Sequence, residues 1–259
     1  MNVAGFNPCV EQQLEDAELC CLVETYPAKH DDYDDYLKTL KIAYLYGKTV
    51  TLINTHWPET NAIMLKNRRI GLSQSGVVQA FNKFGRREIL DWCDNAYDHV
   101  RDLDKEYSNW LCVPRSIRMT SIKPSGTVSL LNGSTPGIHF PENEYYIRRI
   151  RFGKDSDLLD NLEKAGYTIE EDAYSPNTVC VEFPVHEPYY VKGKTDVSLW
   201  EQLEIAAQYQ HYWADNSVSI TVTFKPEEAS SIKPALEMYE TRLKAVSFLK
   251  YEETGYTQA

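Results

Sequence analysis

Apolar helical stripes alternate with short β-rich runs along this chain of 259 residues, and this alternation constrains the fold more than any other feature. A helix is predicted over residues 31–46, with Gly47 as its cap and with one apolar stripe that contains Tyr33, Leu37, Leu40 and Tyr44. Further helices are predicted over residues 60–67, 85–111 (one long helix or two abutting ones), 155–165 and 198–214. Strands are predicted over residues 69–73, 119–123, 145–152, 178–185 and 217–224. This order favours an α/β fold in which helices cover parallel strands, and a barrel is compatible with it.

Local signals define several ends of these elements. Ser198 and Glu201 form a capping box that opens the helix over residues 198–214. Pro124 ends the strand over residues 119–123, and Gly166 ends the helix over residues 155–165. Pro226 opens a last helical stretch, whose predicted continuation has one apolar stripe of Ile232, Leu236, Tyr239, Leu243 and Val246.

The charge balance argues against a nucleic-acid partner. The chain carries 38 acidic and 27 basic side chains, whereas affinity for a phosphate backbone comes mostly from clustered Lys and Arg. The densest basic run is short and contains Arg148, Arg149 and Arg151. No apolar window is long enough to span a bilayer, and there is no secretory signal pattern, so we expect a cytoplasmic protein without a membrane partner.

The six cysteines, at positions 9, 20, 21, 93, 112 and 180, include no C-x-x-C pair. In a cytoplasmic protein such thiols are free, catalytic or metal-bound, because the cytosol keeps structural disulfides reduced. Their spacing does not match a zinc site, so no metal ligand is predicted. Cys112 and Cys180 fall at a predicted helix end and in a predicted strand, and we expect both to be buried apolar side chains.

The segment Asn7-Pro8-Cys9-Val10-Glu11 places an amide, a thiol and a carboxylate at alternate positions. In an extended or loop segment alternate side chains project to one side, so Asn7, Cys9 and Glu11 are predicted to converge on one small ligand. An amide that binds hydroxyls, a sulfur that can be oxidised and a carboxylate that can take a proton suit chemistry on a sugar diol. A loop with one half-buried cysteine accounts for the same residues without any chemistry.

A second candidate site follows Pro124. A strand, a turn of glycine and hydroxyl residues and a helix start at Thr127 would present free backbone N–H groups and hydroxyls to a phosphate. An ordinary strand-to-helix connection has the same pattern.

Together with Cys20, eleven residues after Cys9, the Asn-Pro-Cys-x-Glu motif resembles the active-site finger loop of the ribonucleotide reductases. Further segments match this family in the same order over almost the whole chain: residues 22–24, 66–73, 121–130, 135–139 with 145–149, and 216–222. The resemblance implies the C-terminal portion of the family's ten-stranded α/β barrel, as one partial catalytic domain over residues 1–259 without a separate second domain. The finger loop would span about residues 5–24, near the N-terminus, and the phosphate-binding loop about residues 121–131.

The resemblance implies a role for each finger-loop residue in the reduction of ribonucleotides to 2′-deoxyribonucleotides. Cys9 is similar to the family's thiyl radical, which abstracts the ribose 3′ hydrogen and later returns it. Glu11 is similar to the base that takes the 3′-hydroxyl proton, and Asn7 to the amide that holds the sugar. Cys20 matches one of the two cysteines that reduce the 2′ position, whereas its neighbour Cys21 is expected to be structural.

The resemblance also implies what binds beside these residues and what this chain lacks. The substrate phosphates would lie against Ser125, Gly126, Thr127 and Val128, and His139 would be structural or at the rim. The second reducing cysteine is expected upstream, on a complementary N-terminal half-barrel chain. Residues 255–259 resemble the point after which the family continues toward a redox-active cysteine tail, so we expect a C-terminal piece of a split or truncated enzyme.

The subclass follows from the same resemblance. Reductases that receive their radical from a separate subunit carry two adjacent tyrosines in a segment that resembles residues 243–249, and neither position is a tyrosine here. The glycyl-radical type usually lacks the glutamate that Glu11 matches. The remaining type uses adenosylcobalamin, acts on ribonucleoside triphosphates and receives electrons from thioredoxin-like proteins or another dithiol. Two alternatives stay open: a non-catalytic nucleotide-binding or regulatory fragment, and another thiol enzyme such as a peroxidase or zinc hydrolase.

Overall fold

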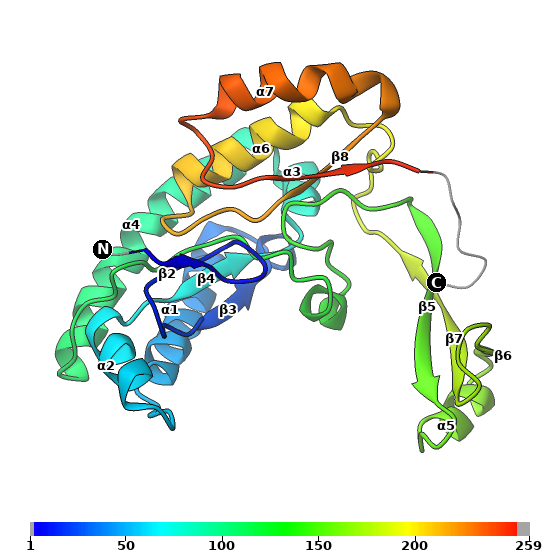
Figure 1. Cartoon of the computed structure of the whole chain (residues 1–259), viewed down its shortest axis with the longest axis horizontal. Helices are drawn as coiled ribbons and strands as arrows, with labels where there is room; N and C mark the ends of the chain where they lie inside the picture. Colours follow the sequence, from blue (N-terminus) through cyan, green and yellow to red (C-terminus); the bar gives the residue numbers. More distant parts are fainter. Residues whose placement is uncertain (1–2, 253–259) are drawn as a thin grey trace.

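The computed structural model describes residues 3–252, in which helices cover a central group of short strands and one β-arm projects to the side (Figure 1). Residues 255–259, compared above with the start of a cysteine tail, lie outside the described residues. The strands are β1 (Gly5–Phe6), β2 (Gln13–Leu14), β3 (Leu22–Thr25), β4 (Gly71–Gln74), β5 (Tyr145–Gly153), β6 (Thr168–Glu171), β7 (Thr178–His186), β8 (Thr221–Phe224) and β9 (Ser247–Lys250). The helices are α1 (Tyr33–Val50), α2 (Pro58–Asn67), α3 (Val77–Phe84), α4 (Arg86–Trp110), α5 (Leu159–Lys164), α6 (Leu199–Tyr212) and α7 (Ile232–Tyr239), with the 3-10 turns η1 (Pro27–Lys29), η2 (Val128–Asn132) and η3 (Pro226–Ser231).

The central strands run parallel, as the sequence predicted. β3 pairs with β4 and β8 pairs with β9, and two parallel bridges, from Leu72 to Thr120 and from Ile122 to Val218, join the pairs. The strand predicted over residues 119–123 is therefore reduced to isolated bridges, and the one predicted over 217–224 begins only at Thr221. Backbone hydrogen bonds still join residues 119–122 to β4 and to residues 216–219, while the Asp215 carboxylate accepts the N–H groups of Met119 and Thr120 at 2.9–3.0 Å.

The β-arm departs from the predicted parallel arrangement. β5, β7 and β6 form an antiparallel sheet with Tyr145 opposite His186 at one end and Gly153 opposite Thr178 at the other. The segment between β5 and β7 holds only the six-residue helix α5 and the strand β6, which itself pairs with β7, so it forms part of the arm and not a helical crossover between parallel strands. The prediction that all strands are parallel is therefore wrong for this arm, which extends away from the central strands (Figure 1).

The core lies between the central strands and helices α1, α4 and α6. Buried side chains of α1 are Tyr36, Leu40 and Tyr44, so the predicted stripe is largely correct, although Tyr33 and Leu37 are only half-buried. Gly47 does not cap α1, which continues to Val50. A Cβ atom at Gly47 would lie 3.1 Å from Cγ2 of Val23, so this glycine allows α1 to approach β3.

Other helix ends also differ from the predictions. The segment 85–111 is one helix, α4, and α3 precedes it without having been predicted. Ser198 caps α6 by accepting the Glu201 N–H, but the Glu201 carboxylate pairs with Lys192 instead of completing a capping box. α7 ends at Tyr239, and Leu243 and Val246 reach the core from outside the helix. Within residues 3–252, no helix combines the length and apolar content needed to cross a bilayer.

Candidate active site

The finger loop is a hairpin whose tip is a tight turn. β1 and β2 pair antiparallel, and the Asn7 N–H donates to the Gln12 carbonyl at 3.1 Å. The Val10 N–H donates to the Asn7 carbonyl at 2.9 Å, so Pro8 occupies the second turn position, where its fixed φ is favourable. Val10 takes a left-handed φ of 66°, which is strained for a β-branched residue. Of the two backbone forms considered in the sequence analysis, an extended segment or a loop, the structure has the loop: a turn brings the side chains together.

Asn7 and Glu11 form the buried centre of this turn. The Asn7 side-chain amide donates to Oε1 of Glu11 at 2.7 Å, while Oδ1 of Asn7 accepts the Gln12 N–H at 2.9 Å. Glu11 is fully buried, and its Oε2 has no hydrogen-bond partner in the described residues. A buried carboxylate oxygen without a donor can accept a proton or a hydroxyl from a ligand.

Cys9 lies at the tip of the turn and is half-buried. Its sulfur is 3.5 Å from Nζ of Lys123, and the same Nζ is 3.4 Å from Oε1 of Glu11. Burial alone would lower the pKa of Lys123, but the neighbouring Glu11 and Cys9 raise it above its ordinary value. Lys123 is therefore a cation that contacts both chemical groups of the turn.

Cys20 completes the predicted set. Desolvation and the charge of Glu11 raise the pKa of Cys20 to about 11, and a hydrogen bond with the Asn7 side chain acts in the opposite direction. Cys20 thus lies beside the turn as a thiol, and the structure brings Asn7, Cys9, Glu11 and Cys20 together. The neighbouring Cys21 is turned away and buried, with its thiol donating to the Gly47 carbonyl at 3.4 Å, as a structural role requires.

The remaining cysteines lie outside this cluster. Cys93 and Cys180 are buried, and burial raises the pKa of Cys93 to about 12. Cys112 is exposed at the end of α4 with a left-handed φ of 53°, so its predicted burial is wrong. The residue follows the last helical turn, where the chain turns back over the surface. No group of three His, Cys, Asp or Glu side chains within residues 3–252 is arranged to hold a metal ion.

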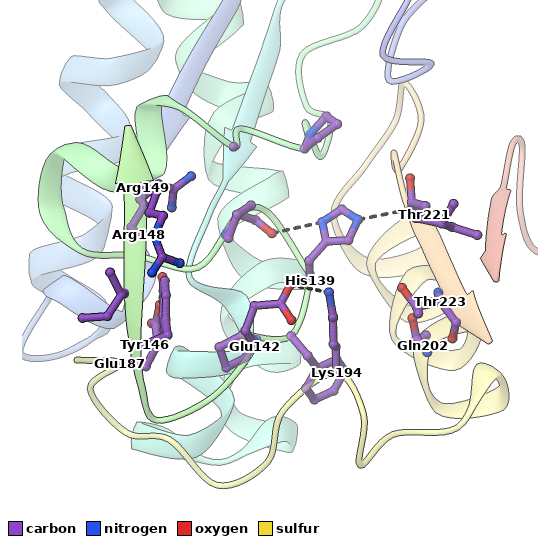
Figure 2. A pocket seen from close by; sticks show the side chains of 17 residues that line it. His139, Glu142, Tyr146, Arg148, Arg149, Glu187, Lys194, Gln202, Thr221 and Thr223 are labelled. Atoms are coloured by element: carbon purple, nitrogen blue, oxygen red, sulfur yellow. Dashed lines mark hydrogen bonds and ion pairs between the residues drawn. The ribbon is translucent and has the colours of Figure 1, made fainter. Parts of the chain in front are cut away.

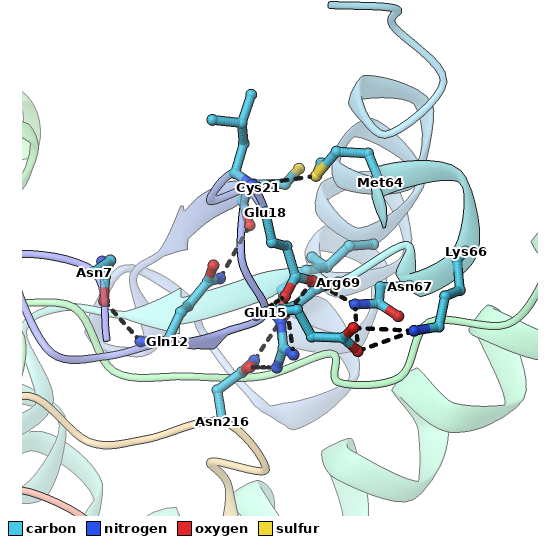
Figure 3. A network of polar contacts seen from close by, with 12 residues as sticks. Asn7, Gln12, Glu15, Glu18, Cys21, Met64, Lys66, Asn67, Arg69 and Asn216 are labelled. Atoms are coloured by element: carbon cyan, nitrogen blue, oxygen red, sulfur yellow. Dashed lines mark hydrogen bonds and ion pairs between the residues drawn. The ribbon is translucent and has the colours of Figure 1, made fainter. Parts of the chain in front are cut away.

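A buried polar network supports the base of the finger loop (Figure 3). Arg69 donates to both oxygens of Glu18, at 3.0 and 3.3 Å, and to Oδ1 of Asn216 at 3.0 Å. Asn67 donates to Glu18 and to Glu15, and both side chains of the Arg69–Glu18 pair are fully buried. The network ties the finger loop to the start of β4 and to the chain that leads into β8.

The finger loop also lies directly on β4. A Cβ atom at Gly71 would lie 2.6 Å from Cδ2 of Leu22 and 2.7 Å from Oγ of Ser121, and it would collide with the Gln12 side chain. Only a glycine permits this approach. The hairpin is therefore held from beneath by close packing as well as by polar contacts.

The predicted phosphate-binding loop takes a different form from the expected helix start. Thr127 precedes the short 3-10 turn η2. Ser125 is buried with a left-handed φ of 54°, and its hydroxyl donates to Oε2 of Glu24 at 2.6 Å. Gly126 and Thr127 are exposed, and in the described part of the chain no acceptor is found for their N–H groups or that of Val128. What this loop offers a ligand is thus its backbone and Thr127, with the Ser125 hydroxyl engaged elsewhere.

Glu24 and Tyr26 hold this loop from below. Besides Ser125, the Glu24 carboxylate accepts the hydroxyls of Ser73 at 3.1 Å and Ser75 at 2.6 Å. Desolvation raises the pKa of Glu24 to about 7 against the effect of these three donors. The Tyr26 hydroxyl donates to the Val128 carbonyl at 3.0 Å.

A cavity of about 550 Å³ opens beside the loop, between β8 and the β-arm (Figure 2). Gly126 lies in its wall, and Arg148 projects into it from β5. Lys194 pairs with Glu142 in the same wall. His139 lies at this wall, where its Nε2 accepts the Thr221 N–H at 3.1 Å, and burial lowers its pKa, so the ring is neutral. This agrees with the structural or rim position expected for His139.

Sequence reasoning missed three contributors to the site: Lys123, Glu24 and the Glu18–Arg69 pair. All of them lie in or beside the segments that carry the family resemblance, which was the only available signal. Neither periodicity nor spacing links residues so far apart in sequence, because their contacts arise only when parallel strands bring the segments together.

Comparisons with known proteins agree with the geometry. The chain is 51% identical over 251 residues to a protein of Dictyostelium discoideum named probable adenosylcobalamin-dependent ribonucleoside-triphosphate reductase. It is 50% identical over 249 residues to the adenosylcobalamin-dependent ribonucleoside-triphosphate reductase of Euglena gracilis and 37% identical to that of Lactobacillus gasseri. These matches cover 95–99% of this chain but 33–39% of the relatives, so the chain spans little more than a third of their length.

Solved structures give the same result. A B12-dependent (class II) ribonucleotide reductase matches all of this chain with a TM-score of 0.91 and 33% identity, over 40% of its own length. The Actinobacillus ureae class Id ribonucleotide reductase alpha subunit matches with a TM-score of 0.68 and 16% identity, which bears on the fold alone. No family model matches the chain. The fold is therefore a mixed α/β portion of the class II reductase fold.

Proposed function

Because this chain is a relative of the adenosylcobalamin-dependent ribonucleoside-triphosphate reductases over nearly its whole length, we propose that it carries the radical centre of such an enzyme. The reaction is the reduction of a ribonucleoside triphosphate to its 2′-deoxy form. Since the chain spans little more than a third of its relatives, the active unit includes the remaining portion of the barrel, supplied by a complementary half-barrel chain. A dithiol such as a thioredoxin-like protein supplies the electrons.

The observation that carries this proposal is the cluster at the tip of the finger loop. Cys9, as a thiyl radical, takes the 3′ hydrogen atom of the ribose, forming an S–H bond as the C–H bond breaks, and returns it at the end. Glu11 takes the 3′-hydroxyl proton at its free Oε2 while Asn7 holds Oε1 at 2.7 Å. The 2′-hydroxyl leaves as water, and Cys20 with a second thiol provides the two electrons and becomes half of a disulfide.

The chain's residues fit the cofactor that the relatives' names specify. Cys9 is half-buried at the apex of the turn, so this side chain is partly accessible and would be the residue that meets the cofactor. When bound, adenosylcobalamin supplies the radical by homolysis of its cobalt–carbon bond. The turn, with Val10 in a left-handed conformation, holds the sulfur for that transfer at a fixed place.

The substrate phosphates lie against Ser125, Gly126, Thr127 and Val128 in this proposal. The N–H groups of the last three, for which no acceptor is found in the described residues, support binding to the anion, and Ser125 acts by fixing the loop on Glu24. The open cavity beside Gly126 leaves space for a phosphate chain. The finger loop and the phosphate-binding loop then belong to one partial barrel domain.

A chimera tests the proposal. The portion of the Euglena gracilis reductase that matches this chain is replaced by residues 1–259, and reduction of ribonucleoside triphosphates is measured with adenosylcobalamin and a dithiol. We expect turnover by the chimera and none above background for its Cys9→Ser variant, because a serine hydroxyl cannot form the radical at accessible energy. Substrate binding by the variant should be unchanged. Turnover by the Cys9→Ser chimera would refute the radical assignment.

A further inference from the structure

Lys123 occupies a position that none of the assigned roles explains. Its Nζ lies 3.5 Å from the sulfur of Cys9 and 3.4 Å from Oε1 of Glu11. The Lys123 side chain is 29% exposed and that of Glu11 is fully buried, so the pair is only partly screened by water. A cation held there acts on both groups.

The backbone of Lys123 is fixed so that its side chain reaches the finger loop. The Lys123 N–H donates to Oγ of Ser73 on β4 at 2.9 Å. Its carbonyl packs against Gly137, where a Cβ atom would lie 2.5 Å from the oxygen, and Gly137 has a left-handed φ of 49°. Two neighbouring segments therefore fix the backbone from which the Lys123 side chain extends to the finger loop.

The two oxygens of Glu11 differ because of Lys123 and Asn7. Both donors contact Oε1, at 3.4 and 2.7 Å, whereas Oε2 is buried without a partner in the described residues. A carboxylate held in this way is fixed through one oxygen and offers the other to a ligand. We propose that Lys123 is a positioning residue that, with Asn7, holds Oε1 of Glu11 so that Oε2 stays free, and that holds the Cys9 sulfur on the same side of the loop.

The other groups that face Lys123 do not replace its partners. Cys20 is close enough to interact, but its pKa of about 11 keeps it an uncharged thiol at neutral pH. Glu24, on β3, interacts with Lys123, but its carboxylate already accepts hydrogen bonds from three serine hydroxyls. The action of Lys123 is therefore directed at Cys9 and Glu11. The functional consequence rests on the proposed function, whereas the contact with Cys9 can be tested without it.

The first test is the rate at which iodoacetamide alkylates each cysteine of the purified chain, followed by mass spectrometry from pH 6 to 9. Thiolate is the reactive form and a neighbouring cation favours it. Lys123→Met should slow alkylation of Cys9 by about fivefold to tenfold at pH 7.5 relative to the exposed Cys112, and Lys123→Arg should restore much of the rate. Lys66→Met is the matched control, because Lys66 pairs with Glu15 beside the same loop without a recorded contact to Cys9.

The second test uses the chimeric reductase. Lys123→Met should lower kcat with little change in KM, since the base and the sulfur lose the side chain that holds them in place while the substrate-binding loop is untouched. Unchanged Cys9 reactivity in a folded Lys123→Met chain would overturn the inference. If Cys9 reactivity responds but the unsubstituted chimera has no turnover, the proposed function fails and, with it, the catalytic consequence. Lys123→Gln replaces Lys123→Met if the latter does not fold.

Discussion

Replacing Arg69 should destabilise the chain more than the loss of any surface ion pair. Arg69 and Glu18 are fully buried, and Arg69 makes at least three hydrogen bonds to Glu18 and Asn216 (Figure 3). Removal of one partner from a buried ion pair costs about 3–5 kcal/mol, because the other charge stays buried. Glu18 retains the Asn67 amide and the Glu15 N–H as donors, so we expect a loss of about 3 kcal/mol for Arg69→Met.

A double-mutant cycle separates the pair from its surroundings. Glu18→Gln removes the charge that Arg69→Met leaves unpaired, so the double variant should be more stable than the sum of the single losses by about 1–3 kcal/mol. Free energies of unfolding are measured by urea denaturation at pH 7. Arg101→Met is the matched control, because Arg101 pairs with Asp98 at the surface, and it should change stability by less than about 1 kcal/mol.

Two results would contradict this reasoning. A loss below about 1 kcal/mol for Arg69→Met would mean that the pair is not a buried charge pair in solution. Additive losses in the cycle would mean that Arg69 acts through packing rather than through Glu18.

Three further predictions concern the site. Cys20→Ser in the chimeric reductase should retain 3′-hydrogen chemistry but release free base instead of deoxynucleotide, as measured by chromatography of products; clean deoxynucleotide would remove the reducing role. Gly126→Glu should weaken triphosphate binding more than diphosphate binding in calorimetry, since a Cβ atom there meets no neighbouring atom and the added carboxylate repels a longer phosphate chain more; equal losses would count against that loop. The pKa of Glu24 is raised from 4.5 to about 7, so the folded chain holds the proton of this carboxyl group more tightly than the unfolded chain does. The stabilisation of the fold by protonated Glu24 is therefore complete below pH 4.5 and is lost as pH rises through 7. Glu24→Gln should therefore remove a decline of up to about 3 kcal/mol in unfolding free energy between pH 4.5 and 8, and an unchanged slope would refute the assignment.

Local patterns in the sequence predicted those parts of the fold that local physics controls. The helices around Leu40 and Trp92 and the parallel central strands follow from apolar periodicity and from alternation, and the structure confirms them. The antiparallel arm could not be predicted in this way, because pairing direction depends on how the chain returns after β5. The strand predicted over 119–123 is reduced to two bridges, and Asp215, distant in sequence, accepts two of its backbone N–H groups, which no local pattern indicates.

The candidate site also has features that the sequence could predict and features that it could not. The clustering of Asn7, Cys9 and Glu11 could be predicted because all three lie in one turn, although the turn geometry was not. Ser125 was predicted as a phosphate ligand from the chemistry of its hydroxyl, yet that hydroxyl is bound to Glu24. Lys123 had no local signal at all, since its partners lie more than a hundred residues away.

Two of the segments that resemble the reductases have a common structural role in the fold. Residues 66–73 supply Asn67 and Arg69, residues 216–222 supply Asn216, and each holds the base of the finger loop. A buried ion pair contributes little net stability, so its advantage here is that it permits one arrangement of the loop. The proposed radical centre would require such fixity, because in that proposal Cys9 and Glu11 act on adjacent atoms of one sugar. We therefore expect that loosening this network would impair the chemistry at Cys9 before it unfolds the chain.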